Sequence, residues 1–287
     1  MHKKHHICVV GSVNMDIGFD VDTLPGAGET ALAASVRSTP GGKGANQAVA
    51  AARAGAQVQF VGAVGDDPSA AQLRDHLNAN GVGTDGLITV SGRSGTAVVI
   101  VDSAGENIIV VAPGANSGLT LEPTVLRKLV ADCDVLLLQL EIPVATATAA
   151  ARAARSAGVT VILNASPAGG DEAELAQLAE VTDVLVVNET EDTHWVWPVP
   201  HRVTTRGARG AGYVGDGSEF TVAAPVVDAL DTSGAGDVFA GVLAAGWTVD
   251  RDRALRRACA AGALATLVPG AGDCAPYADA IDQATGI

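Results

Sequence analysis

Short runs of Val, Ile and Leu alternate along this chain with alanine-rich stretches of helical length, and this alternation constrains the fold most strongly. Strands that are apolar on both faces must be covered on both sides, and single helices between them connect parallel neighbours. The expected strands are 7–11, 58–64, 135–140, 159–164 and 183–188. The expected helices are 45–55, 69–80, 122–131, 144–157, 172–180, 236–246 and 252–267. We therefore predict an α/β fold, a three-layer α/β/α sandwich whose mostly parallel central sheet binds its ligand at the carboxyl ends of the strands.

Two segments interrupt this alternation. Residues 17–37 hold β-prone pieces around a turn at 25–28, and residues 96–112 have the pattern of a β-hairpin. We expect them to form a small β-sheet within one domain spanning 1–287. Because inserted segments on a rigid sheet often carry function, this sheet is predicted to be a lid or a dimer surface.

Charge and aromatic content exclude several classes of protein. The 287 residues carry 18 Lys and Arg against 32 Asp and Glu, a net charge of −14, with only 3 Trp, 2 Tyr and 4 Phe. Nucleic-acid binders need basic surfaces and stacking aromatics, and a membrane span needs ~18 apolar residues. We expect neither partner. The scattered Cys8, Cys133, Cys259 and Cys274 are typical of reduced thiols, and the polar segment 1–6 predicts no signal peptide, so we expect a cytoplasmic protein.

Glycine-rich motifs for common nucleotide sites are incomplete. The G-x-G-x-x-G matches at 81–86 and 210–215 do not follow a strand and open a helix, so we interpret both as turns. Gly42-Lys43 lacks the upstream glycine and the following Ser or Thr of a P-loop. The sequence therefore favours neither a dinucleotide fingerprint nor a Walker loop.

A different glycine-rich turn, in the segment DTSGAGDVFAG at 231–241, opens an apolar helix. Successive N–H groups of Gly234, Ala235 and Gly236 at a helix start form a nest for phosphate oxygens. Asp237 lies beside this nest. Since a carboxylate repels a ground-state phosphate, it suits a base that takes a proton from an attacking hydroxyl, while an Asp that only stabilises the helix dipole is an equally good local interpretation.

A second turn of this kind, GGKGAN at 41–46, opens another expected helix. Its glycines let the backbone approach a ligand, Lys43 supplies a charge, and Asn46 offers a donor and an acceptor to a pair of hydroxyls. Asn14 and Asp16 add two more hydroxyl-binding groups after the first strand. This combination favours a polyol ligand over a planar apolar one, and the alternative is a tight turn before a capped helix.

Together these motifs resemble the PfkB carbohydrate kinases, also called the ribokinase family. Segments 41–65 and 231–241 match the two family signatures, and the similarity continues at 11–16, 104–116, 137–143 and 188–191, over nearly the whole chain. The resemblance implies a ribokinase-like fold and an ATP-dependent kinase with an alcohol group as acceptor. GGKGANQAVAAARAGA with LLQLE looks most like the branch that converts D-ribose to D-ribose 5-phosphate at the primary 5-hydroxyl. The alternatives are a kinase for another pentose, deoxyribose, a hexose or a nucleoside, and a catalytically impaired sugar-binding relative.

The resemblance also implies residue roles. The sugar hydroxyls would be held by Asn14, Asp16, Gly42, Lys43, Asn46 and Glu141, with Asp237 as catalytic base beside the anion hole of Gly234, Ala235 and Gly236. ATP phosphates and Mg²⁺ would be served by Asn188 and Glu191, and the nucleotide would lie along Thr205, Gly207, Gly210 and Gly236. An activating K⁺ would be bound by Asp231, Ser233, Ala265, Val268, Gly270 and Cys274. The β lid would join two copies as a homodimer.

The interval 192–204 is unusually short. It supplies only 13 residues between two expected parallel neighbours, and Pro198 and Pro200 prevent a helix there. Because the family normally places a helix in this interval, we interpret it as the deletion of an α/β unit. Trp195 and Trp197 either cover the sheet face left bare or mark a poorly packed segment, in which case ATP binding or stability would suffer.

Overall fold

The computed structural model describes residues 5–122 and 124–286. The strands are β1 (His6–Val10), β2 (Asn14–Asp20), β3 (Ser35–Gly41), β4 (Gln57–Val64), β5 (Val82–Thr89), β6 (Gly95–Val101), β7 (Asn107–Ala112), β8 (Val135–Leu138), β9 (Thr160–Asn164), β10 (Val184–Asn188), β11 (His201–Thr205), β12 (Ala211–Gly215) and β13 (Ser218–Val222). The α-helices are α1 (Lys43–Arg53), α2 (Pro68–Ala79), α3 (Thr124–Ala131), α4 (Val144–Ser156), α5 (Glu172–Ala179), α6 (Glu189–Asp192), α7 (Ala235–Gly246), α8 (Arg251–Ala265) and α9 (Ala278–Thr285). Two 3₁₀ turns are η1 (Gly114–Gly118) and η2 (Gly207–Arg209).

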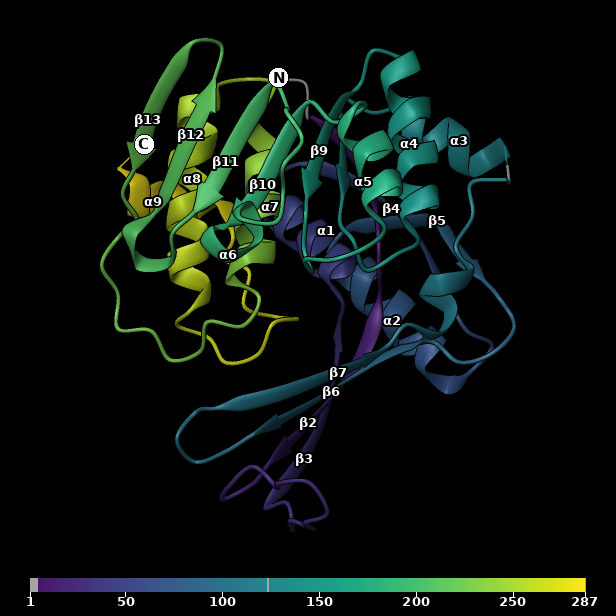
Figure 1. The fold of residues 1–287 in the computed structure, drawn as a ribbon, viewed down its shortest axis with the longest axis vertical. Helices are drawn as coiled ribbons and strands as arrows, with labels where there is room; N and C mark the ends of the chain where they lie inside the picture. Colours follow the sequence, from purple (N-terminus) through teal and green to yellow (C-terminus); the bar gives the residue numbers. More distant parts are fainter. Residues whose placement is uncertain (1–4, 123, 287) are drawn as a thin grey trace.

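Within the described ranges, nine strands form one sheet in the order β13-β12-β11-β10-β9-β8-β1-β4-β5. The strands from β11 to β5 pair in parallel, and β12 and β13 add an antiparallel edge. Helices cover both faces of this sheet (Figure 1). This arrangement confirms the predicted three-layer α/β/α sandwich.

The hydrophobic core is divided by the large sheet into two clusters. Because successive strand residues point to opposite faces, Val9 packs in the cluster with α1, α2, α7, α8 and α9, whereas Cys8 packs in the one with α3, α4 and α5. Alanines such as Ala48 and Ala151 are fully buried where these helices meet the sheet. Among the helices in the described part of the chain, none is long and apolar enough to cross a membrane.

The predicted strands and helices form, with ends shifted by at most two residues; position 123 of the predicted helix 122–131 lies outside the described residues. The interpretation of 81–86 and 210–215 as turns is wrong. Only the first glycine of each, Gly81 with φ 75° and Gly210 with φ 88°, has a turn conformation. The following residues enter β5 and β12, because neighbouring strands β4 and β11 offer them hydrogen-bond partners.

The two predicted β segments join in a second sheet that projects from the sandwich as an arm (Figure 1). Its order is β3-β2-β6-β7, with β2 pairing in parallel with β6 and each antiparallel with its other neighbour. The strands reach beyond the predicted range 17–37, since β2 begins at Asn14 and β3 ends at Gly41. Asn14 and Asp16 therefore lie in the first strand of the arm, directly after β1.

The short interval 192–204 still connects two parallel neighbours, because Val184 of β10 pairs with His201 of β11. After α6, no helix occurs before His201 in this described stretch, in agreement with the two prolines. Trp195 is only 5% exposed and packs in the cluster that contains α3, α4 and α5, with its ring edge-on to Trp197 at 5.2 Å between centroids. The structure thus favours Trp195 as a cover for the sheet over a poorly packed segment.

Trp195 should therefore contribute strongly to stability. We expect Trp195→Ala to lower the free energy of unfolding by about 3–5 kcal/mol, because truncation of a buried tryptophan removes its contacts and leaves a cavity. The matched control is Val196→Ala, since Val196 is 77% exposed and its truncation should change stability by less than about 0.5 kcal/mol. Urea denaturation of both variants measures the difference, and equal midpoints would show that Trp195 does not support the sheet.

Candidate active site

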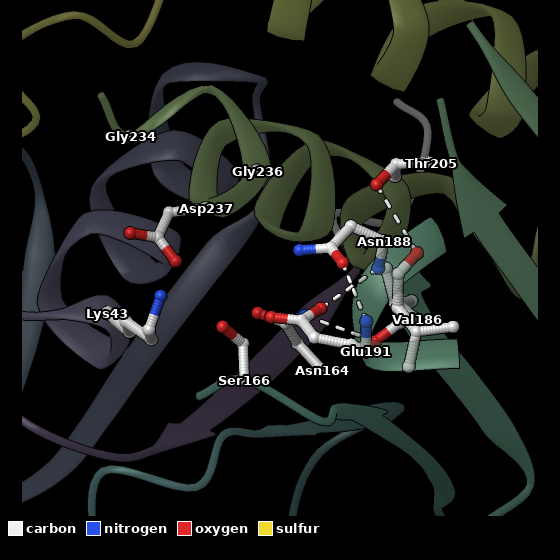
Figure 2. A pocket seen from close by; sticks show the side chains of 11 residues that line it. Lys43, Asn164, Ser166, Val186, Asn188, Glu191, Thr205, Gly234, Gly236 and Asp237 are labelled. Carbon is white, nitrogen blue, oxygen red and sulfur yellow. Dashed lines mark hydrogen bonds between the residues drawn. The ribbon is translucent and has the colours of Figure 1, made fainter. Parts of the chain in front are cut away.

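A pocket opens where the carboxyl ends of β9, β10 and β11 meet the start of α7 (Figure 2). It is lined by Lys43, Asn164, Ser166, Val186, Val187, Asn188, Glu191, Thr205, Gly234, Gly236 and Asp237. The fold brings together residues that the sequence singled out in segments far apart in the chain. They are Lys43, Asn188, Glu191, Thr205, Gly234, Gly236 and Asp237. Asn164 and Ser166 are additional polar groups that the sequence did not single out.

The start of α7 forms the anion-binding side of this pocket. Gly234 has φ 76°, and a Cβ atom there would lie 2.8 Å from Cα of Ala271, so both conformation and space require glycine. The Ala235 N–H donates to the carbonyl of Thr232 at 3.3 Å, which leaves Gly234 and Gly236 to present the available amides of the predicted nest. Unpaired N–H groups at a helix start, together with the helix dipole, attract phosphate oxygens.

Asp237 lies beside this turn with its carboxylate fixed from two sides. Asn46 Nδ2 donates to Oδ2 at 3.1 Å, and Gln47 Nε2 donates to Oδ1 at 3.0 Å. Both donors come from α1, and Asp237 is only 7% exposed. A buried carboxylate held by neutral donors next to an anion site can accept a proton from a bound hydroxyl.

Lys43 provides a positive charge close to Asp237. Its ammonium points toward the Asp237 carboxylate, with Asn188 and Glu191 across the pocket (Figure 2). Burial opposes the charged form, but the attraction of Asp237, Glu141 and Glu191 outweighs burial and raises the pKa of Lys43 above its ordinary value. Lys43 therefore stays protonated at neutral pH. Its ammonium lies in the pocket between the start of α7 and the residues predicted to bind the sugar.

The predicted sugar residues lie next to this pocket. Gly42, with φ 91°, caps α1, and a Cβ atom there would lie 2.8 Å from the backbone nitrogen of Asn14. Glu141 Oε2 accepts from the Ser12 hydroxyl at 2.6 Å and from the Lys43 N–H at 3.2 Å. Asp16 Oδ1 is buried with no hydrogen-bond partner among the described residues. An unpaired buried carboxylate oxygen fits a ligand hydroxyl that supplies the missing donor.

Asp16 carries the most strongly shifted carboxyl pKa beside the pocket. Burial is the largest cause, and the nearby charges of Glu141 and Asp237 add to it, raising the pKa of Asp16 to about 7. Near neutral pH this carboxyl is therefore divided between its protonated and ionised forms, and its ability to accept hydrogen bonds changes across that range.

The sequence did not predict several hydrogen bonds that position residues of the site. Asn116 Nδ2 donates to Asn14 Oδ1 at 2.7 Å, and Asn116 Oδ1 accepts from the Val13 N–H at 3.0 Å. Ser12 orients Glu141, and Gln47 orients Asp237. Ser12, Gln47 and Asn116 all lie inside segments that match the family, so a buried polar residue within a signature was the available signal.

Asn188 and Glu191 form a capping box at the start of α6. Asn188 Oδ1 accepts from the Glu191 N–H at 2.8 Å, and Glu191 Oε2 accepts from the Asn188 N–H at 2.9 Å. The second carboxylate oxygen of Glu191 remains for a ligand. No group of three or more His, Cys, Asp or Glu side chains suited to a metal occurs within 5–122 and 124–286. A cation bound here would need phosphate or water oxygens as further ligands, as Mg²⁺ commonly does.

The predicted nucleotide segment 205–210 is only partly at the pocket. Thr205 lines it, whereas Gly207 begins the η2 turn and Gly210 follows that turn, and neither glycine is among the lining residues. Arg209 pairs instead with Glu189 of α6, with 2.6 Å between Nη2 and Oε2. This pair holds η2 against the start of α6.

The predicted monovalent-cation residues gather behind the nest. Asp231 Oδ1 accepts from the Ser233 N–H and Oδ2 from the Gly270 N–H, both at 2.8 Å. Burial opposes ionisation of Asp231, but these hydrogen bonds outweigh it and hold its pKa below the ordinary value. The Asp231 N–H donates to the carbonyl of Thr266. This bond joins the loop before α7 to the turn at the end of α8, in which the Val268 N–H donates to the carbonyl of Ala265.

Cys274 completes this cluster without acting as an anion. Its Sγ donates to the carbonyls of Ala271 at 3.4 Å and Ser233 at 3.8 Å. Burial, followed by the charge of Asp237, raises the pKa of the Cys274 thiol to about 11, so the thiol stays neutral. Its hydrogen bonds connect the loop after α8 to the turn before α7.

Comparison with known proteins defines the class of the chain. The model of the pfkB family carbohydrate kinases matches residues 4–197 and 198–278, so the chain belongs to this family. It is 36% identical to the ribokinase of Bacillus subtilis, over 97% of this chain and 98% of that protein. It is 33% identical to the deoxyribokinase of Salmonella typhi, over 83% of this chain and 84% of that protein. The structure of Arabidopsis thaliana ribokinase complexed with ribose and ATP superposes with a TM-score of 0.89 at 29% identity, covering 99% and 100% of the two chains.

Proposed function

We propose that this protein transfers the γ-phosphoryl group of ATP to the 5-hydroxyl of D-ribose, giving D-ribose 5-phosphate and ADP. The observation that carries the proposal is the placement of the Asp237 carboxylate, oriented by Asn46 and Gln47, directly beside the amides of Gly234 and Gly236. Family membership and full-length similarity to ribokinases support the choice of ATP and ribose. The protein is thus an ATP-dependent carbohydrate kinase.

The residues divide the reaction between positioning and charge stabilisation. Asn14, Asp16, Gly42, Asn46 and Glu141 would hold the sugar hydroxyls, with the 5-hydroxyl against Asp237. Asp237 takes the hydroxyl proton as the oxygen forms its bond to the γ-phosphorus and the bond to the bridging oxygen of ADP breaks. The amides of Gly234 and Gly236 and the Lys43 ammonium stabilise the charge on the transferring oxygens.

The nucleotide and its Mg²⁺ would occupy the opposite side of the pocket. Asn188 and Glu191 fit the ion and its waters, because Glu191 keeps one carboxylate oxygen outside its capping box. When bound, Mg²⁺ neutralises charge on the phosphates. Thr205, with Gly207 and Gly210 behind it, would support the nucleotide.

An ADP-release assay with ribose, deoxyribose, fructose and adenosine tests this function, with the phosphorylated carbon identified by ³¹P NMR. We expect ribose to have the highest kcat/KM and the 5-position to be modified. A preference for deoxyribose would assign the chain to that substrate instead. Binding of sugar without any ADP release would identify a sugar-binding relative and contradict the kinase proposal.

Sugar binding should depend on the ionisation of Asp16. Because the pKa of Asp16 is about 7, lowering the pH from 8 to 6 protonates a carboxylate that would accept hydrogen bonds from the sugar. We expect the KM for ribose to rise over this range, and Asp16→Asn to have a higher KM that no longer varies in this way. Without ligand, the free energy of unfolding should fall as pH rises from about 4 to about 7, since the unfolded carboxyl loses its proton first. A ribose KM that is flat with pH in the unsubstituted protein would contradict this role.

The cluster behind the nest would bind K⁺ as an activator. Asp231 and Ser233, with the carbonyls of Ala265, Val268 and Gly270, would hold an ion whose position supports the orientation of the nest amides. Turnover should then be higher in K⁺ than in Na⁺ at equal ionic strength, and Cys274→Ser should keep this preference because the thiol is neutral. Equal rates in both salts would argue against a cation site.

The arm would pair two copies of the chain. The outer strand β7 exposes Ile108, Ile109, Val110 and Val111 by 41–63%, and an exposed apolar strand is a common association surface. Sedimentation should show a homodimer, and Val110→Lys should convert it to a monomer. A monomeric unsubstituted protein at working concentration would refute this assembly.

The short interval 192–204 would be a reduced connection within one catalytic domain that spans residues 1–287. The family match divides into two stretches that meet between residues 197 and 198, inside this interval, which supports the loss of an α/β unit. Because ATP is kept inside cells, the cytoplasm is the proposed location, and fractionation of cells that express the protein tests it.

A further inference from the structure

We propose that Gln47 is a positioning residue for phosphoryl transfer, which fixes the Asp237 carboxylate while its own amide is fixed by Gln139 and Asn164. This inference rests on the proposed function of Asp237 as the base. Gln47 and Gln139 are completely buried, and Asn164 is only 7% exposed. The sequence analysis singled out none of these three residues, and only Asn164 is among the residues that line the pocket.

The hydrogen bonds of Gln47 run in one direction toward Asp237. Gln139 Nε2 donates to Gln47 Oε1 at 2.8 Å. Gln47 Nε2 then donates twice, to Asn164 Oδ1 at 3.0 Å and to Asp237 Oδ1 at 3.0 Å. A side-chain amide nitrogen has two hydrogens, so both are used.

The two acceptors, Asn164 Oδ1 and Asp237 Oδ1, prevent the Gln47 amide from turning over. Asn164 Nδ2 donates to the carbonyl of Val186 in β10 at 3.1 Å, which keeps Asn164 Oδ1 as the acceptor that faces Gln47. A flipped Gln47 would place its oxygen against Asn164 Oδ1 and Asp237 Oδ1. In a buried site such unpaired contacts are strongly unfavourable, so a donor always faces Asp237.

The same helix also reaches the substrate side. Lys43 and Asn46 lie in the first turn of α1, four residues and one residue before Gln47. Asn46 Nδ2 holds Oδ2 of Asp237 while Gln47 holds Oδ1, so two adjacent residues fix both oxygens of one carboxylate. Loss of either donor lets the carboxylate rotate away from an in-line hydroxyl. In the described part of the chain, the side-chain hydrogen bonds of Gln47 reach Gln139, Asn164 and Asp237. Removal of its amide should therefore change kcat and not substrate binding.

The decisive variant is Gln47→Met, which keeps length and volume but removes the amide. We expect kcat with ribose to fall about 10- to 100-fold, because hydrogen bonds to charged groups have effects of this size, while the KM for ribose and the Kd for ATP change less than about threefold. Gln59→Met is the matched control, since Gln59 lies in β4 away from the pocket. Its kcat should equal that of the unsubstituted protein.

A coupling measurement separates positioning from general loosening of the core. Gln139 touches Gln47 but not Asp237, so Gln139→Met should lower kcat by a smaller factor, and it should cause no additional loss when Gln47→Met is already present. If Gln139→Met lowered kcat by the same factor with and without Gln47→Met, the two residues would act independently, and the proposed positioning of Asp237 through Gln47 would be contradicted. If Gln47→Met does not fold, Gln139→Met alone decides: reduced kcat at constant ribose KM supports the role, and unchanged kcat overturns it.

The outcomes distinguish this role from the proposed function itself. If the unsubstituted protein phosphorylates no sugar, the proposed function fails, and the role of Gln47 fails with it. If the unsubstituted protein turns over and Gln47→Met keeps kcat within twofold, only the positioning role is overturned. A rise in KM at constant kcat would assign Gln47 to substrate binding and likewise overturn it.

Discussion

Replacement of Asp237 by Asn is expected to lower kcat about 10²- to 10⁴-fold while ribose and ATP still bind. The substitution keeps the size of the side chain but removes the group that accepts the proton of the 5-hydroxyl, and general-base catalysis contributes factors of this order. Asn46 and Gln47 both donate to Asp237, so the new amide must also turn its NH₂ group toward one of these donors. Steady-state ADP release gives kcat, and calorimetric titration gives the two affinities.

The matched control for this variant is Asp252→Asn. Asp252 also lies in the first turn of a helix, α8, but it is exposed and outside the pocket. The free energy of unfolding of Asp252→Asn should fall by no more than a few tenths of a kcal/mol, from the lost interaction with the helix dipole, and its activity should be unchanged. If Asp237→Asn kept most of its turnover, the carboxylate would only stabilise the start of α7 and another group would be the base.

The second large effect is expected for Gly236→Ala, in which stability and activity should change in opposite directions. Apart from the chain neighbours of Gly236 and the backbone of its own helix, no heavy atom of the described residues lies within 4 Å of a Cβ atom at this position. Because Gly236 lines the pocket, the methyl group would enter the space proposed for phosphate oxygens. The N–H of residue 236 remains, but the methyl group would keep phosphate oxygens away from it, so we expect kcat/KM for ATP to fall on the order of 10²-fold, as when an anion hole loses one donor. The melting temperature should stay equal or rise, because alanine is favoured over glycine within a helix by about 0.5–1 kcal/mol.

Gly118→Ala serves as the control for an added methyl group. Gly118 ends η1, and a Cβ atom there would lie 3.8 Å from the nearest atom, Cγ2 of Val90, away from the pocket. Its kinetics should match those of the unsubstituted protein. Normal ATP kinetics in Gly236→Ala would mean that phosphate does not approach the start of α7.

The fold could be predicted where burial imposes a strong pattern. Segments such as 135–140 and 159–164 are apolar on both faces because they lie in the centre of the sheet, and their neighbours 144–157 and 172–180 have helical length. The edge strands β5 and β13, and β12 beside β13, were missed, since glycines and polar residues in VGTDGLIT, SEFTV and AGYVG weaken the strand pattern. At an edge, pairing with one neighbour replaces burial as the main stabilising contact.

The site could be predicted only to the extent that local conformation determines it. Gly42 and Gly234 are required by positive φ angles, and such turns at helix starts are visible in a single sequence. The hydrogen bonds from Gln47 to Asn164 and Asp237 connect positions 117 and 190 residues apart, and the bond from Ser12 to Glu141 spans 129. No local pattern encodes such pairs, because the sheet order decides which strand ends meet.

The arm has a mechanical consequence for ligand binding. Asn14 and Asp16 belong to β2, so the arm itself supplies part of the wall against which a sugar would rest. The segment joining β2 to β3 is exposed from Gly26 onward, whereas helices cover both faces of the large sheet. A protease cut in this loop would leave the sandwich folded and the nucleotide side intact, yet release β3 and weaken the hold on sugar. Sugar affinity and nucleotide affinity should therefore be lost separately during limited digestion.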